Sequence, residues 1–248
     1  MSGYSDAGYQ CHVDWGITAS IRAAERGDIL VIVDVLSFST SVIAAVSRGA
    51  VIYPCPMGHD RFEYAARVGA EAAVRRKQVP EKGRFSLSAL TYQQIEPGTR
   101  VVLPSPNGGT CSYEARHAPY LFVGALTNAE AAADAVMRLI GRENRRVSVI
   151  ACGERVGLPS GQELRWAVED YLGAGAILSF LMAEKSPEAR ACEAAFRGCR
   201  DGLYDALWGC ESGRELREHG FEKDIEYAAQ LNFSGCVPTT RGEFFEAL

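Results

Sequence analysis

ILVIVDVLSFSTSVIAAV, residues 29–46, decides the fold class of this chain. Five aliphatic residues run into Asp34, and a hydroxyl-rich stretch then opens an apolar segment of helical length. An unbroken apolar run is typical of a strand buried on both faces, as in a parallel sheet that is covered by helices. The stretch therefore predicts a strand over 29–35 and a helix over 41–48.

The same alternation continues along the chain. Short runs rich in Val and Ile recur at 50–53, 101–103, 121–123 and 147–151, and segments with helical spacing lie at 60–68 and 128–140. This pattern predicts an α/β fold in which a largely parallel sheet is layered between helices. No linker or repeat divides residues 1–248, so we expect a single compact unit with a helical C-terminal portion over 186–248.

Capping signals mark several helix starts. The S/T-x-x-E pattern occurs at 127–130, 160–163 and 212–215, and Ser186-Pro187 offers a cap followed by proline. The segment 171–182 is apolar almost all round, which predicts a helix buried on most sides. Glu169 and Asp170 should emerge from the core at its start.

Composition excludes several functional classes. The chain has 26 Lys+Arg and 31 Asp+Glu, a net charge of −5, and its basic residues are scattered except for the step at 75–77. Nucleic acid is therefore not an expected partner. No apolar run approaches the ~20 residues of a membrane helix, and the first residues do not resemble a secretory signal, so we expect a cytoplasmic protein. The eight cysteines contain no C-x-x-C pair and signal no zinc site.

The first candidate site follows the strand at 29–35. Asp34 lies at its carboxyl end, and Ser39 and Thr40 lie where the next helix opens. Ligands of open α/β sheets bind outside the carboxyl ends of strands, and helix N-termini bind anions, so this arrangement suits a metal-bridged phosphate ester. The alternative is structural, with Asp34 in a turn and Ser39 and Thr40 as helix caps.

The second candidate is the loop Ser105-Pro106-Asn107-Gly108-Gly109-Thr110, which follows the strand at 101–103. Asn-Gly-Gly permits unusual backbone angles, and the loop exposes consecutive N–H groups that can form an anion-binding nest. Thr110 can cap the helix that follows. A plain turn is the alternative.

Two further segments offer charged side chains. Gly153, Glu154 and Arg155 follow the strand at 147–151, and a planar guanidinium matches phosphate or carboxylate oxygens. A surface Glu–Arg pair is the alternative there. Glu169 and Asp170 are about 100° apart on a helix, so at most one faces a shared site, and a solvated helix end is the alternative.

Nine strings, in order, resemble the 2-phosphosulfolactate phosphatase family. They are DVLSFSTS at 34–41, SLSAL at 86–90, LPSPNGGT at 103–110, GALTNA at 124–129, ACGER at 151–155, AVEDYLGAGAI at 167–177, SGREL at 212–216, DIEYAAQLN at 224–232 and Val237-Pro238. The resemblance covers nearly the whole chain. It implies an α/β fold and a magnesium-dependent phosphatase that releases phosphate from 2-phospho-3-sulfolactate on the route to coenzyme M, with a homodimer as the expected assembly.

The resemblance also assigns site residues. Those that carry over by position are Asp34, Thr40, Asn107, Gly108, Asn128, Gly153, Glu169 and Asp170. Ser37, Ser86 and Ala89 do not carry over, because family members have an arginine at the first position and an acidic residue and an asparagine near the other two. Arg155 is the best available replacement for that arginine. The chain is thus similar to a divergent branch of the family, in which the substrate can differ.

The leading hypothesis is a Mg²⁺-dependent phosphatase of a small phosphorylated 2-hydroxy acid, 2-phosphosulfolactate or a related anionic ester. Asp34 with Glu154 or Asp170 would hold the metal, and the amides of loop 105–110 would balance charge on the phosphoryl group. Direct attack by water and a phosphoenzyme on Asp34 both stay open. The alternatives are a catalytically inactive small-anion-binding protein of the same fold, and an enzyme that uses Cys152 as nucleophile.

Overall fold

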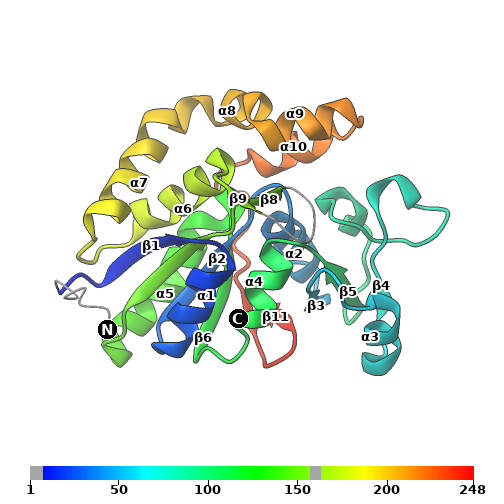
Figure 1. Cartoon of the computed structure of the whole chain (residues 1–248), viewed down its shortest axis with the longest axis horizontal. Coiled ribbons are helices and arrows are strands. Elements are labelled where there is room, and N and C mark those ends of the chain that lie inside the picture. Colours follow the sequence, from blue (N-terminus) through cyan, green and yellow to red (C-terminus); the bar gives the residue numbers. More distant parts are fainter. Residues whose placement is uncertain (1–7, 157–162) are drawn as a thin grey trace.

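The fold is organised around a nine-stranded sheet (Figure 1). The computed structural model describes residues 8–156 and 163–248. The strands of this sheet are β1 (Cys11–Trp15), β2 (Ile29–Val33), β3 (Val51–Cys55), β4 (Glu71–Ala72), β5 (Arg100–Pro104), β6 (Tyr120–Gly124), β7 (Val147–Ala151), β10 (Pro238–Thr240) and β11 (Phe245–Ala247). Their order is β1-β7-β2-β6-β10-β11-β3-β5-β4, and β8 (Glu154–Val156) and β9 (Glu163–Arg165) form a separate ribbon.

Two parallel blocks make up the sheet. β1, β7, β2 and β6 pair in parallel, as do β3, β5 and β4. The hairpin of β10 and β11 joins the blocks, because β10 pairs antiparallel with β6 and β11 pairs antiparallel with β3. The predicted largely parallel sheet is confirmed. The antiparallel hairpin has strands of only three residues, which are too short to leave an alternating pattern in the sequence.

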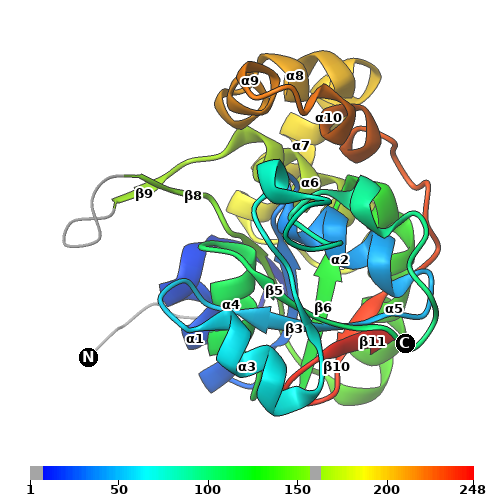
Figure 2. The same ribbon diagram turned by 90° about the vertical axis from the view of Figure 1, so that its right-hand side faces the viewer.

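Helices cover the sheet on both sides. The α-helices are α1 (Gly16–Glu25), α2 (Phe38–Val46), α3 (Arg61–Val68), α4 (Gly108–Glu114), α5 (Ala129–Glu143), α6 (Val168–Phe180), α7 (Pro187–Cys199), α8 (Leu203–Gly209), α9 (Glu211–Glu218) and α10 (Glu222–Ala228). In Figure 2 the sheet lies between α1 and α4 on one side and α5 on the other. α1 contacts α4, whereas α5 and α7 both pack on α6. α2 is buried along its whole length, since it carries no charged residue.

The helix starts only partly follow the predicted capping signals. Ser186 caps α7 by accepting the Ala189 N–H at 3.2 Å, which confirms the Ser-Pro prediction. The box predicted at 127–130 is wrong, because a 3₁₀ turn occupies Leu126–Asn128 and α5 starts after it. The box at 212–215 is wrong too, because Cys210 caps α9 instead. The box at 160–163 lies largely outside the described residues.

The last part of the chain is helical only as far as Ala228. α7 to α10 run together along one side of the molecule (Figure 1, yellow to orange). The chain then returns to the sheet as β10 and β11. Among the described residues, no helix is both long and apolar enough to cross a membrane.

Candidate active site

A cavity of about 500 Å³ opens beside the carboxyl end of β2. Its walls come mainly from the turn after β2, the loop between β5 and α4, the segment 74–77 after β4, and α9. The predicted site residues that line it are Asp34, Ser105, Asn107 and Glu154. Residues from the ends of two strands that belong to different blocks of the sheet therefore meet in one cavity.

Asp34 is a buried carboxylate, with 5% of its surface exposed. Its Oδ2 accepts a hydrogen bond from the Gly108 N–H at 2.8 Å, and its Oδ1 accepts one from the Phe38 N–H at 3.1 Å. Burial raises the pKa of Asp34, the two amides lower it, and the charge of Glu169 raises it. The two amides fix this carboxylate in one orientation at the cavity wall.

Gly108 allows the backbone of the loop 105–110 to approach the Asp34 carboxylate. A Cβ at position 108 would lie 2.5 Å from Phe38 Cδ1 and 2.8 Å from Asp34 Oδ2. Real side chains do not tolerate such distances, so glycine alone brings its amide this close to the carboxylate. The N–H of Gly108 is thereby committed to Asp34.

Ser39 and Thr40 stabilise the turn that carries Asp34. The Ser39 Oγ accepts the Asp34 N–H at 2.9 Å, and the Thr40 Oγ1 donates to the carbonyl of Val35 at 2.8 Å. Both side chains are buried, and neither lines the cavity. Their observed contacts are therefore with the backbone of the turn. The alternative that they cap the helix is wrong, because both lie inside α2, whose N-cap is Ser37.

The loop 105–110 contributes Ser105 and Asn107 to the cavity wall. The Thr110 Oγ1 donates to the Ser105 carbonyl at 3.0 Å, and Gly109 sits close to the Ser105 side chain. Thr110 and Gly109 do not line the cavity. The prediction that Thr110 caps the next helix is wrong, because Thr110 lies inside α4, whose N-cap is Asn107. The loop thus holds a carboxylate through Gly108 instead of presenting a full row of free amides.

Glu154 is another carboxylate at this wall. The Asn107 Nδ2 donates to Glu154 Oε1 at 2.9 Å, and the Arg155 N–H donates to the same oxygen at 3.1 Å. Burial raises the pKa of Glu154 to about 7, with a further contribution from the charge of Asp34. Glu154 and Asp34 are therefore close enough to repel each other when both are ionised.

Asp170 and Glu169 are buried at the start of α6, each with 3% of its surface exposed. The expectation that they emerge from the core, as a solvated helix end, is wrong. Asp170 accepts hydrogen bonds from the Val35 N–H at 2.7 Å and the Gly153 N–H at 2.9 Å, which compensate for the lost water. Burial and the charges of Asp34 and Glu169 raise the pKa of Asp170 well above its usual range. Gly153 and these two acids do not line the cavity.

Three other predicted residues lie away from this cavity. Asn128 is fully buried and bonds the backbone at 123, 125 and 236. Arg155 and Cys152 line a second hollow of about 280 Å³ beside Trp15. Burial raises the pKa of Cys152 well above that of an ordinary thiol, which disfavours the reactive thiolate.

Four basic side chains of the cavity were not predicted as site residues. They are Arg61, Arg75, Arg76 and Lys77. Three of them form the basic step noted in the sequence, but nothing in the sequence placed that step beside Asp34. The Arg76 Nη2 donates to Ser37 Oγ at 2.7 Å. Arg76, and not Arg155, thus brings a guanidinium to the position where the family resemblance expects an arginine.

The carboxylate oxygens at the cavity wall suit a magnesium ion that is bound by only one or two protein ligands. The described residues contain no group of three or more His, Cys, Asp or Glu side chains arranged to hold a metal. Asp34 and Glu154 line the cavity together, and Mg²⁺ is commonly held by one or two carboxylates together with substrate phosphate and water. Asp170 does not line the cavity, unlike this pair.

Comparison with known proteins shows the family of the chain. The family model described as 2-phosphosulpholactate phosphatase matches residues 16–243. The chain is 31% identical to a Carboxydothermus hydrogenoformans protein named "Probable 2-phosphosulfolactate phosphatase", over 84% of each chain. It is 29% identical to the 2-phosphosulfolactate phosphatase of Methanothermobacter thermautotrophicus, over 91% of this chain and 92% of that protein. The chain belongs to the 2-phosphosulfolactate phosphatase family, a family of phosphoric monoester hydrolases.

Proposed function

We propose that the protein is a Mg²⁺-dependent phosphatase that hydrolyses 2-phosphosulfolactate or a closely related phosphorylated 2-hydroxy acid. The observation that carries this proposal is the mixed charge of one cavity, in which Asp34 and Glu154 share the lining with four basic side chains. A metal ion can bridge carboxylates and a phosphate group, while guanidinium groups bind further anionic groups of the same molecule. The names of the relatives point to a substrate of this kind.

The cavity residues would have different roles in this reaction. Asp34 and Glu154 would hold the magnesium ion, which when bound neutralises charge on the phosphoryl group. Asn107 orients Glu154 through its Nδ2. The Ser105 Oγ lies 3.5 Å from Asp34 Oδ2, so its hydroxyl would lie near the phosphoryl group bound at Asp34. Asp34 has to be ionised whether water attacks directly or Asp34 itself attacks phosphorus, because both routes use a charged oxygen.

A phosphate-release assay tests this proposal. The protein is incubated with 2-phosphosulfolactate and with glycerol 2-phosphate, first with Mg²⁺ and then with excess EDTA. We expect release from 2-phosphosulfolactate with Mg²⁺, its loss in EDTA and its recovery when Mg²⁺ is restored. Turnover that resists EDTA contradicts the metal requirement. Tight binding of an ester without turnover would identify an anion-binding protein instead.

Three further expectations belong to the same proposal: a cytoplasmic location, a role on the route to coenzyme M, and a homodimer. All eight cysteines are free thiols, which is usual in a reducing compartment. Phosphate release from 2-phosphosulfolactate would support the proposed role on the route to coenzyme M. Sedimentation that gives a single species of 26.9 kDa at working concentration contradicts the dimer.

A further inference from the structure

Arg76 is held on three sides at the cavity wall. Its Nε donates to Asp224 Oδ2 at 2.9 Å, and its Nη2 donates to Ser37 Oγ at 2.7 Å. Its guanidinium also lies 5.7 Å from the centre of the Phe221 ring. These contacts fix the plane of the guanidinium before any ligand arrives, which reduces the entropy lost on binding.

The residue that anchors Arg76 is itself fixed. Asp224 lies on α10 and is buried, with 4% of its surface exposed, and the Ser88 hydroxyl donates to its other oxygen. Ser37, Arg76 and Asp224 come from three segments that are far apart in the sequence. A buried arrangement of this kind holds one guanidinium in place, as a preformed receptor requires.

One edge of this guanidinium remains for a ligand. The Arg76 Nη1 makes no hydrogen bond within residues 8–156 and 163–248. Arg76 Nη1 can therefore donate to an oxyanion that enters the cavity without breaking an existing hydrogen bond.

The two carboxylates and Arg76 are held by different parts of the cavity wall. Asp34 and Glu154 are both bonded to the loop 105–110, through the Gly108 N–H and the Asn107 Nδ2. Arg76 is bonded instead to Ser37 and to Asp224 on α10. A substrate with two anionic groups can place one at each end.

We infer that Arg76 binds the non-transferred anionic group of the substrate, a carboxylate or a sulfonate, and that Asp224 positions it. This inference rests on the proposed phosphatase function, which places the phosphoryl group at Asp34 and Glu154. A planar guanidinium with one edge fixed presents its remaining N–H groups to an oxyanion in a defined direction. Arg76 is thus a specificity residue and takes no part in breaking the phosphate ester.

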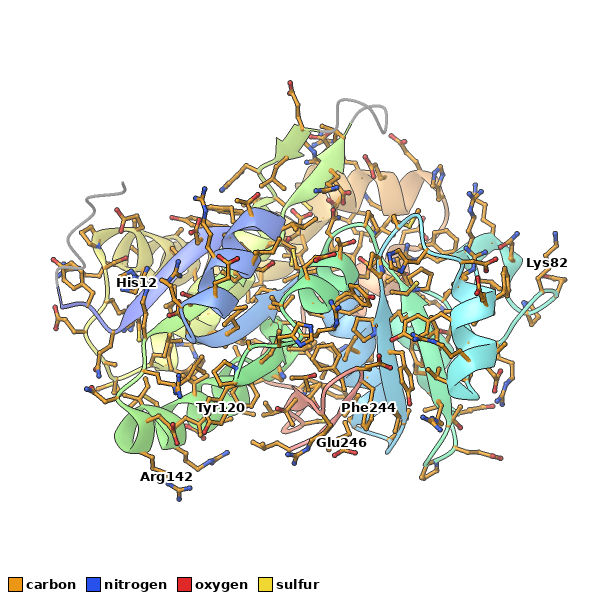
Figure 3. The ribbon with its side chains drawn as sticks, turned by 60° about the horizontal axis from the view of Figure 1, so that its bottom comes forward. His12, Lys82, Tyr120, Arg142, Phe244 and Glu246 are labelled. Carbon is orange, nitrogen blue, oxygen red and sulfur yellow. The ribbon has the colours of Figure 1, made fainter. Side chains whose placement is uncertain are left out.

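The test compares two esters in each variant. 2-Phosphosulfolactate carries the further anions, and glycerol 2-phosphate lacks them. We expect Arg76→Gln to lower the ratio of their kcat/KM values about 100-fold through KM, the effect of a lost charge-assisted hydrogen bond pair. Arg76→Lys should lower it less, and Asp224→Asn should lower it through KM while kcat is kept. Lys82→Gln is the control, since Lys82 is exposed on the same segment and points away from the molecule (Figure 3).

Further esters identify the group that Arg76 binds. A lactate 2-phosphate carries the carboxylate alone, and a phosphorylated 2-hydroxyethanesulfonate carries the sulfonate alone. The ester whose KM responds to Arg76→Gln carries the recognised group. An unaltered ratio in Arg76→Gln, or the same ratio change in Lys82→Gln, overturns the inference.

A binding measurement separates this inference from the proposed function. If the wild-type protein releases phosphate from no ester, the phosphatase proposal fails. Calorimetry with sulfolactate, which lacks the phosphate, then tests Arg76 directly. Binding that weakens in Arg76→Gln and persists in Lys82→Gln supports the receptor. Equal binding to wild type and Arg76→Gln, or no binding to wild type, overturns it.

Discussion

Asp34→Asn removes a charge and also changes the local hydrogen-bond pattern. The carboxylate accepts the Gly108 N–H at 2.8 Å and the Phe38 N–H at 3.1 Å, one on each oxygen. An amide has one acceptor oxygen, so in either orientation its NH₂ group faces one of these N–H donors. A buried donor left without an acceptor costs about 1–3 kcal/mol. The lost repulsion with Glu169 offsets part of that cost.

We therefore expect Asp34→Asn to fold, with a melting temperature lowered by at most about 10 °C, since 1 kcal/mol corresponds to about 2–4 °C in a chain of this size. Turnover should fall on the order of 1000-fold, or about 4 kcal/mol of transition-state stabilisation. The assay is phosphate release from 2-phosphosulfolactate at saturating Mg²⁺, with thermal unfolding measured on the same preparation. A residue that only stabilises a turn would lower stability and leave kcat nearly intact.

Asp28→Asn is the matched control for this experiment. Asp28 is a buried aspartate directly before β2, at the opposite end of that strand from Asp34. Its Oδ2 accepts from the Arg26 Nη2 and from the Ser148 Oγ, both at 2.7 Å. The substitution should lower the melting temperature and leave kcat intact. Near-normal turnover in Asp34→Asn, or an equal loss of kcat in Asp28→Asn, would refute the assignment.

Three other substitutions test the remaining assignments. Gly108→Ala places a Cβ 2.8 Å from Asp34 Oδ2, so we expect a loss of about 1–3 kcal/mol in unfolding free energy together with most of kcat, measured by urea titration and phosphate release. In EDTA the unfolding free energy should fall as pH rises from 4.5 to about 7, because the unfolded chain releases the Glu154 proton first. Glu154→Gln should remove up to about 3 kcal/mol of that fall. An unaltered pH profile in this variant would contradict the assignment of the fall to Glu154. Cys152→Ser should keep most of the turnover, since burial raises the pKa of that thiol; a loss of several hundredfold would make it the nucleophile.

The buried strands were the most predictable part of the fold. All five residues of β2 and of β7 are buried, so β2 is a continuous apolar run and β7 is interrupted only by Ser148. The helices α2 and α6 were predictable for the same reason, because each is apolar on most sides. The hairpin of β10 and β11 was not, because its three-residue strands are defined by their partners β6 and β3 and not by their own pattern.

The burial of Asp170 could not be predicted from the local sequence. An acidic pair at a helix start normally faces water, and the 3.6-residue period says only that the two side chains diverge. The amides that allow Asp170 to be buried belong to Val35 and Gly153, and Val35 is 135 residues away in the chain. Only the packing of α6 against the turn after β2 brings these groups together. Asp34 depends on Gly108 in the same way, across 74 residues.

The basic wall of the cavity bears on the alternative of an inactive binding protein. That alternative was motivated by two absences relative to the family resemblance, the arginine expected at position 37 and the acidic residue expected near Ser86. Arg76 reaches Ser37 from 39 residues further along the chain, and Asp224, another 148 residues on, holds it there. A guanidinium is thus present at this place although the local motif has lost it. Divergence at Ser37 is therefore no argument that the site has lost its positive charge, and a net charge of −5 does not reveal that the step at 75–77 and Arg61 line one cavity.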